Sequence, residues 1–171
     1  MLCLSCGYEN IEGADRCEEC LTPLSKLDVP QGDDAEGLAR SVMEDTLSLL
    51  EREETITVPP DESALNVARQ MKTARSGCAL VVENGKLVGI FTEHDVLHRM
   101  CGAQVAATTN LPVKELMSHN PESLKETDSV AVALNKMSLG RYRHIPVRRA
   151  DGTYTVTSIK SVLKYIAKED W

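Results

Sequence analysis

The stretch VVENGKLVGIFTEHDVLHRM (residues 81–100) decides the fold of most of this 171-residue chain. Two β-rich runs flank Asn84-Gly85, a dipeptide that is among the strongest short signals for a hairpin turn. The second run leads into a helix predicted over residues 93–100. Upstream, residues 56–58 predict a short strand, and the acidic and hydroxyl residues 61–63 predict the start of an amphipathic helix. The predicted order of elements is therefore β-α-β-β-α.

The same order recurs about 66 residues further along the chain. The segment LSLLEREETITVPPDESALNVARQM (47–71) aligns with VKELMSHNPESLKETDSVAVALNKM (113–137) without a gap. Further on, CALVVENGKLVGIFTEHDVLHRM aligns with HIPVRRADGTYTVTSIKSVLKYI, with Val82 on Val147 and Thr92 on Thr157. A unit of ~60 residues buries little core alone, so we expect the two units to pack against each other.

Composition excludes several classes of protein. Hydrophobic residues make up 42% of the chain, which argues against general disorder. No apolar run approaches the ~20 residues of a membrane span, and the first six residues lack the features of a secretory signal, so we expect a cytoplasmic protein. The net charge of −7 weighs against nucleic acid as a partner.

Four of the six cysteines, Cys3, Cys6, Cys17 and Cys20, form two Cys-x-x-Cys pairs separated by ten residues. This spacing predicts a structural zinc site, since four thiolates complete a tetrahedron and leave no open position. A pair of disulfides or a thioredoxin-like redox motif are the alternatives. Residues 1–24 resemble small zinc-ribbon heads. Acidic residues outnumber the single arginine in this head, so we expect scaffolding or a protein partner there and not a nucleic acid.

The remaining boundaries follow from polarity and periodicity. Residues 25–37 are predicted to be a linker, because aspartate, proline and glycine interrupt them. An amphipathic packing helix is predicted over residues 35–51, and its acidic character does not suit a membrane surface. The predicted domains are a zinc ribbon (1–24), a linker (25–37), a first unit with its leading helix (38–104) and a second unit (105–171).

Two motifs in the repeat are typical of a known family. Residues 89–95 (GIFTEHD) fit the pattern Gly-φ-φ-Thr/Ser-x-x-Asp, where φ is apolar, and residues 143–147 (RHIPV) contain a φ-Pro-Val strand. Over about residues 40–170 the chain resembles a tandem pair of CBS domains, often called a Bateman module. The resemblance implies an α+β fold, homodimers of such pairs, and binding of AMP, ADP, ATP or S-adenosylmethionine between the units. It implies no catalysis.

The resemblance also suggests which residues touch the ligand. In the family, the aspartate of one unit holds the ribose hydroxyls, which points to Asp95. The Pro-Val strand of the other unit encloses the adenine, which points to Ile145 and Pro146. The loop that precedes the second unit's first strand adjoins the nucleotide, so Pro121 and Ser123 are expected contacts.

The residues themselves support an anion site. Thr92 stands at the predicted start of a helix, where free N–H groups favour an anion, and Asp95 can accept two hydrogen bonds from a vicinal diol. The alternative is a capping box between these two side chains. In the second unit Thr157 is retained, but Lys160 stands at the expected aspartate position and Tyr154 at the glycine position. That second site would therefore be empty, or Lys160 would contact a phosphate.

A basic stretch interrupts the acidic chain between residues 136 and 149. It contains Lys136, Arg141, Arg143, His144, Arg148 and Arg149 and no acidic residue. Because Arg143 and His144 directly precede the Pro-Val strand, we expect them to contact a phosphate. The alternative is a solvated surface strand, whose alternation would separate Arg148 from Arg149.

Other candidates carry less weight. Cys78 lies in an apolar run and is expected to be a packing residue. His94 and His98 are four residues apart, a spacing that alone is weak evidence for a metal.

The sequence supports two functional hypotheses: a regulatory, non-enzymatic module that binds an adenosine-containing ligand, or a scaffold whose CBS-like pair binds none. An enzyme is not expected, because the chain has no recognisable catalytic motif.

Overall fold

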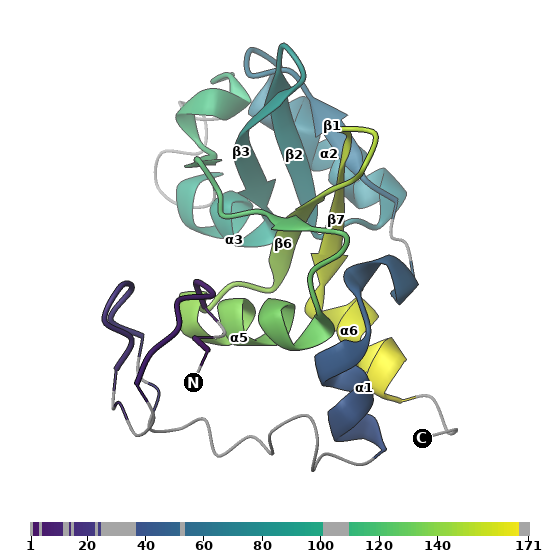
Figure 1. Cartoon of the computed structure of the whole chain (residues 1–171). Coiled ribbons are helices and arrows are strands. Elements are labelled where there is room, and N and C mark those ends of the chain that lie inside the picture. The colour runs from purple at the N-terminus through teal and green to yellow at the C-terminus, as the bar shows by residue number, and fades with distance from the viewer. Residues whose placement is uncertain are drawn as a thin grey trace.

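Figure 1 shows a computed structural model that describes residues 2–3, 5–11, 14, 16–22, 24, 37–51, 54–100 and 110–167. The predicted order β-α-β-β-α is confirmed in both units. Unit 1 contains β1 (Ile56–Val58), α2 (Ala64–Ala74), β2 (Cys78–Glu83), β3 (Lys86–Thr92) and α3 (Glu93–Asp95), which continues as the π-helical turn η2 (Val96–Met100). Unit 2 contains β5 (Leu124–Lys125), α5 (Val130–Gly140), β6 (His144–Arg148), β7 (Tyr154–Ser158) and α6 (Ile159–Ile166).

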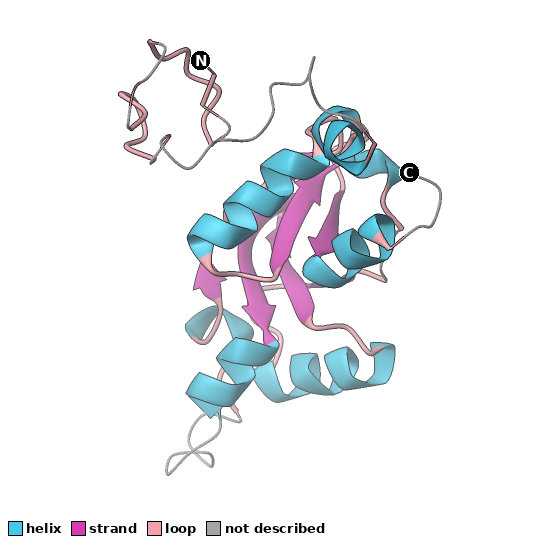
Figure 2. Cartoon of the chain, turned by 90° about the horizontal axis from the view of Figure 1, so that it is seen from below, coloured by secondary structure: helices cyan, strands magenta, loops and turns pink. Residues whose placement is uncertain are grey.

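Each unit has its own sheet, and helices lie on opposite sides of the strands (Figure 2). The first sheet has the order β1-β2-β3-β4, where β4 is Ser118–His119, and the second has the order β5-β6-β7. In both sheets the first pair of strands is parallel and the next is antiparallel. Between the sheets, Cys78, Leu80 and Ile90 pack with Val156 of β7. Cys78 is therefore a buried packing residue, as its apolar neighbours predicted.

The strand register corrects the predicted alignment of the repeats by one residue. Cys78 pairs with Thr92 in unit 1, and His144 pairs with Ser158 in unit 2. Ser158, and not Thr157, therefore corresponds to Thr92. The hairpins differ in form: unit 1 turns at Asn84-Gly85 and has a β-bulge between Val81 and Val82, whereas the β6–β7 pairing is regular. The turn of unit 1 is shorter than that of unit 2, and this would shift the pairing of β2 with β3 by one residue. The bulge compensates for the shift, so Cys78–Thr92 and His144–Ser158 pair in the same way.

The segment that precedes unit 1 packs on unit 2. It comprises α1 (Leu38–Glu44) and the 3₁₀ turn η1 (Leu47–Leu49). Leu47 and Leu50 belong to the core of unit 2, and the Leu47 N–H donates to the Asp128 carbonyl at 2.9 Å. The predicted helix over 35–51 is therefore too long. It ends at Asp45, whose carbonyl accepts from Val130 and whose carboxylate accepts from the Tyr165 hydroxyl at 2.7 Å.

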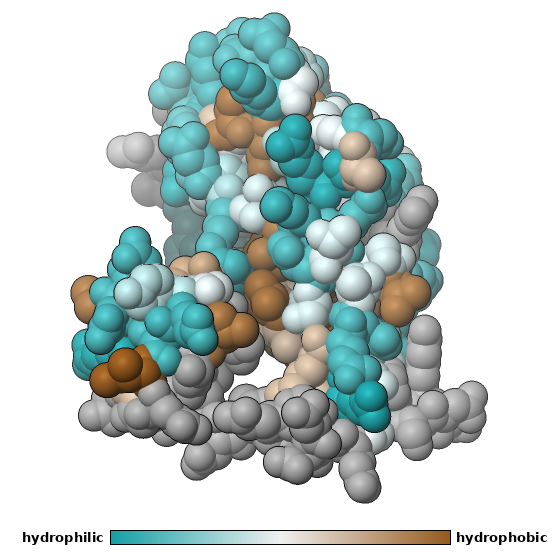
Figure 3. Space-filling view, in the orientation of Figure 1, coloured by the Kyte–Doolittle hydropathy of each residue, from teal (hydrophilic) through white to brown (hydrophobic). Residues whose placement is uncertain are grey.

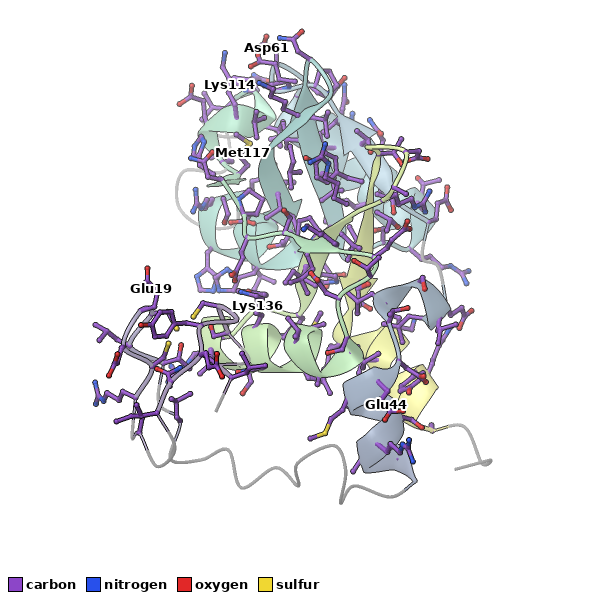
Figure 4. All side chains as sticks on the ribbon, viewed as in Figure 1. Glu19, Glu44, Asp61, Lys114, Met117 and Lys136 are labelled. Carbon is purple, nitrogen blue, oxygen red and sulfur yellow. The ribbon has the colours of Figure 1, made fainter. Side chains whose placement is uncertain are left out.

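The segment that precedes unit 2 packs in the same way on unit 1. The 3₁₀ turn η3 (Val113–Glu115) contributes Val113 to the core of unit 1, and the two residues that join η3 to β4 contribute Leu116 and Met117. Met117 lies so close to Gly89 of β3 that a Cβ atom there would be 2.8 Å from its Cε (Figure 4). The packing therefore crosses the predicted boundary between 38–104 and 105–171, because each unit is completed by the segment that precedes the other.

The predicted linker lies outside the described residues except for Gly37. In the described part of the chain, no helix is long and apolar enough to cross a membrane.

Candidate functional site

A cavity of about 620 Å³ lies between the two units. This volume falls within the roughly 300–1,000 Å³ of small-molecule sites. Unit 1 contributes the end of β3 and the α3–η2 helix. The opposite wall comes from the loop before β5 and from residues 141–146. Six of the eight predicted ligand residues line it: Thr92, Asp95, Pro121, Arg143, His144 and Pro146.

The structure does not bring Ile145 or Ser123 to the cavity. Ile145 is fully buried in the core of unit 2, because side chains alternate along β6 and its neighbours His144 and Pro146 take the cavity side. Ser123 is exposed and does not line the cavity. The structure therefore does not place the side chains of these two residues in the cavity.

Thr92 and Asp95 form a capping box at the start of α3. Oδ2 of Asp95 accepts from the Thr92 backbone N–H at 2.9 Å and from the Thr92 hydroxyl at 2.7 Å. The Asp95 N–H donates in return to the Thr92 hydroxyl. The other oxygen, Oδ1, lies 3.4 Å from Nε of Arg99. The capping alternative thus holds, and Oδ1 is the acceptor that remains for a ligand hydroxyl.

The opposite wall carries the positive charge. Arg141 ends α5 in the left-handed conformation, and it and Arg143 have exposed side chains that form no salt bridge with any residue the structure describes. The imidazole of His144 lies over Gly77 of unit 1, where a Cβ atom would be 2.5 Å from Nε2. Arg148 and Arg149 do not line the cavity. Of the basic stretch, therefore, only Arg141, Arg143 and His144 line the cavity.

Sequence reasoning missed Glu122 and Tyr142, which also line the cavity. The Tyr142 hydroxyl donates to Oε2 of Glu122 at 2.8 Å, and the Lys136 ammonium forms an ion pair with Oε1. Burial raises the pKa of Glu122, but the bonds from Lys136 and Tyr142 outweigh it and the pKa is lowered. Burial and the same carboxylate raise the pKa of Tyr142. The sequence signal that could have identified Glu122 is its position directly after Pro121, which was a predicted ligand contact.

The corresponding position in unit 2 lacks a carboxylate. Ser158 caps α6, and buried Ser161 takes the place of Asp95, with its Oγ accepting from the Ser158 N–H at 3.0 Å. The prediction that Lys160 occupies this position is wrong, because the alignment was displaced by one residue. Lys160 is exposed, and its backbone N–H donates to the Ser158 hydroxyl. Ser161 donates its proton to the Ser158 carbonyl and so remains a weak acceptor for a diol.

The four cysteines of the head converge on one point. Their sulfur atoms all lie within 4.8 Å of one another, with Cys3 and Cys20 at 3.6 Å and Cys6 and Cys17 at 3.5 Å. Zn–S bonds of about 2.3 Å in a tetrahedron place the sulfurs about 3.8 Å apart. All four are free thiols in the structure. The four sulfur donors and their spacing therefore fit a metal ion bound by four thiolates.

The two cysteine pairs have the same backbone turn. The N–H of Gly7 donates to the Cys3 carbonyl at 2.8 Å, and the N–H of Leu21 donates to the Cys17 carbonyl at 2.9 Å. Both residues have positive φ, 75° for Gly7 and 58° for Leu21. Only the second turn places a side chain in this conformation, which is unfavourable for any residue with a Cβ atom.

Thiol ionisation in the head is uneven. Hydrogen bonds with the side chain and backbone of Thr22 lower the pKa of Cys20 to about 6, although burial opposes them. The backbone of Tyr8 lowers the pKa of Cys6, but burial and the neighbouring thiols raise it to about 12. A cation at the centre would favour the thiolate at Cys6, because its attraction for each thiolate would outweigh the repulsion between them.

The head also presents apolar side chains to solvent, visible as brown atoms on its surface in Figure 3. The exposed residues are Leu2, Tyr8, Ile11 and Leu21.

Comparisons with known proteins agree with this architecture. A family model for the CBS domain matches residues 44–102 and 113–168. CBS domain-containing protein CBSCBSPB5 from Arabidopsis thaliana is 34% identical over 119 residues, which cover 68% of this chain and 22% of the relative. This chain thus spans about a fifth of the length of the curated Arabidopsis relatives that it matches.

Solved structures show the same fold. A CBS-domain protein from Agrobacterium tumefaciens is 30% identical, with a TM-score of 0.60 and coverage of 66% of this chain and 90% of that one. The crystal structure of CBSX2 in complex with AMP has 19% identity and a TM-score of 0.60, and the match covers 70% of this chain and 94% of that one.

Proposed function

Because this chain belongs to the CBS-domain family, whose model matches two segments of it, we propose that it is a regulatory module that binds an adenosine-containing ligand between its two units. AMP, ADP, ATP and S-adenosylmethionine are the candidate ligands. The module has no catalytic role in this proposal.

One observation carries the proposal: a single cavity combines three kinds of contact that such a ligand needs. Asp95 at a helix N-terminus offers an acceptor for ribose hydroxyls, while Arg143 offers a cation and His144 an imidazole N–H for a phosphate. Pro121 and Pro146 provide apolar surface for a base. The solved CBS pair of CBSX2, which binds AMP, supports the same ligand class.

The position of the cavity supports a regulatory role. Asp95 comes from unit 1, while Arg143 and His144 come from unit 2, so a bound ligand would bridge the units. A ligand shifts the arrangement of two units only if it binds one arrangement more tightly than another. The segment 38–51 packs on unit 2 and follows the head in the chain. A movement of unit 2 on ligand binding could therefore be passed to the cysteine cluster through this segment.

The head is proposed to hold one structural zinc ion through Cys3, Cys6, Cys17 and Cys20. Four thiolates leave no position for a substrate, so the metal would supply stability to a segment with little core of its own. The exposed apolar residues of the head support a protein partner there. Exposed Leu139 on α5 and Leu163 on α6 support a homodimer through the CBS pair.

A second candidate function is a scaffold that binds no ligand. The capping box favours it, because one oxygen of Asp95 is already engaged by Thr92 and the other faces Arg99. Ser161, at the equivalent position of unit 2, lacks a carboxylate altogether.

Calorimetric titration with AMP, ADP, ATP and S-adenosylmethionine separates the two functions. The ligand hypothesis predicts binding by the wild type and a loss of about tenfold or more in Asp95→Ala, since a hydrogen bond to a charged group contributes roughly 1.5–3 kcal/mol. Ser161→Ala is the matched control, because it removes the equivalent cap in the other unit. No heat with any of the four compounds, together with no rise in Tm, favours the scaffold.

A further inference from the structure

We propose that Glu122 is a specificity-determining residue that selects a base carrying an exocyclic amino group. The proposal rests on the proposed function, and names the part of the ligand that one wall of the cavity recognises. It concerns a residue outside the motifs that indicate the family.

The position of Glu122 makes its carboxylate available to a ligand. It follows Pro121, which lines the apolar part of the cavity with Ile90 and Pro146. The Glu122 side chain is 50% exposed, whereas the Lys136 side chain that pairs with it is only 12% exposed. Lys136 extends from α5 on the side that faces unit 1 (Figure 4). The carboxylate is therefore the more exposed member of the ion pair.

The two partners hold the carboxylate without saturating it. Lys136 binds Oε1 and the Tyr142 hydroxyl donates to Oε2, so each oxygen has received one hydrogen bond and can accept another. Tyr142 itself comes from the cavity wall between Arg141 and Arg143. The ammonium of Lys136 keeps the carboxylate ionised, which is consistent with the lowered pKa of Glu122. The outcome is a fixed, charged hydrogen-bond acceptor beside an apolar surface.

A fixed acceptor discriminates between bases by their donors. The 6-amino group of adenine can donate to the free acceptor position of such a carboxylate, whereas a base without an amino group leaves that acceptor position without a partner. AMP and purine riboside 5′-monophosphate differ only in this amino group. The wild type should bind AMP about ten- to hundredfold more tightly, which is the range expected for a hydrogen bond to a charged group.

The test compares these two nucleotides by calorimetry in the wild type, Glu122→Gln and Glu83→Gln. Glu83 is an exposed acid at the end of β2 that does not line the cavity, so it serves as the matched control. Glu122→Gln should reduce the ratio of the two dissociation constants to about threefold or less, and Glu83→Gln should leave it unchanged. Tyr142→Phe keeps the charge and should retain most of the preference.

A purely structural role for Glu122 would lower the Tm of Glu122→Gln but leave the ratio unchanged, and that result would overturn the proposal. Equal binding of the two nucleotides by the wild type would also overturn it, while leaving the proposed function intact. Binding of neither nucleotide would overturn this inference, whereas the proposed function falls only if ADP, ATP and S-adenosylmethionine also fail to bind.

Discussion

Replacing Gly77 by alanine tests the placement of His144 in the cavity. A Cβ atom on Gly77 would lie 2.5 Å from Nε2 of His144 and 2.7 Å from its Cε1. Nonbonded atoms settle at about 3.5–4.0 Å, so the imidazole must retreat by about 1 Å. Both atoms lie at the far end of a rotatable side chain, and the ring should move in preference to the backbone.

The expected cost to folding is small. A side chain moved about 30° from its rotamer costs roughly 0.5–1.5 kcal/mol. A Gly→Ala change returns about 0.4–1 kcal/mol where φ is not positive, because the alanine restricts the unfolded chain, and Gly77 has no positive φ. The free energy of unfolding should therefore change by less than about 1 kcal/mol, or about 2–4 °C in Tm.

Affinity for a phosphorylated ligand should respond much more strongly. A displaced His144 would lose its proposed hydrogen bond to the phosphate of AMP, and about 1.5–3 kcal/mol corresponds to a roughly 10- to 150-fold weaker Kd for AMP. Adenosine, which has no phosphate, should bind both proteins equally. In a His144→Ala background, Gly77→Ala should have no further effect, because the displaced ring is absent. A folded Gly77→Ala protein that binds AMP like the wild type would refute the reasoning.

Three further substitutions test the packing and the head. Gly89→Ala should destabilise the chain by about 1–3 kcal/mol, because a Cβ atom would lie 2.8 Å from Cε of buried Met117, and Met117→Ala should recover part of the loss in thermal unfolding. Leu21→Gly should stabilise the zinc-loaded head by roughly 1 kcal/mol, since Leu21 has a φ of 58°; faster loss of zinc to a chelator would contradict this. Burial and the bond to Asp45 raise the pKa of Tyr165, so its contribution to stability is complete below about pH 10 and is lost as the pH rises above that value. In urea unfolding at a series of pH values above 10, the free energy of unfolding of Tyr165→Phe should therefore fall less steeply with pH than that of the wild type. An equally steep fall in both proteins would contradict this prediction.

Local signals in the sequence account for most of the secondary structure. Asn84-Gly85 marks the first hairpin, and hydroxyl residues mark the starts of the helices in both units. The same local signals misplaced the second site. Thr157 and Ser158 are adjacent hydroxyl residues that could each cap a helix, and only the pairing of β6 with β7 shows that Ser158 does so.

Tertiary contacts account for what the sequence could not show. Nothing in the periodicity of residues 35–51 indicates that α1 packs on unit 2, because that choice depends on bonds to residues such as Asp128 and Tyr165, far along the chain. Glu122 was overlooked for a similar reason. Its partners Lys136 and Tyr142 are 14 and 20 residues away, and the sequence places them on a helix and in a loop without stating that they meet.

The bridging of the two units by one ligand is tested most directly by amide chemical shifts in an isotope-labelled full chain titrated with AMP. The account predicts saturable shifts at Thr92 and Asp95 of unit 1 and, with the same dissociation constant, at Arg143 and His144 of unit 2, while Ser158 and Ser161 remain unchanged. Shifts at only one of the two walls, or shifts confined to Ser158 and Ser161, would contradict it.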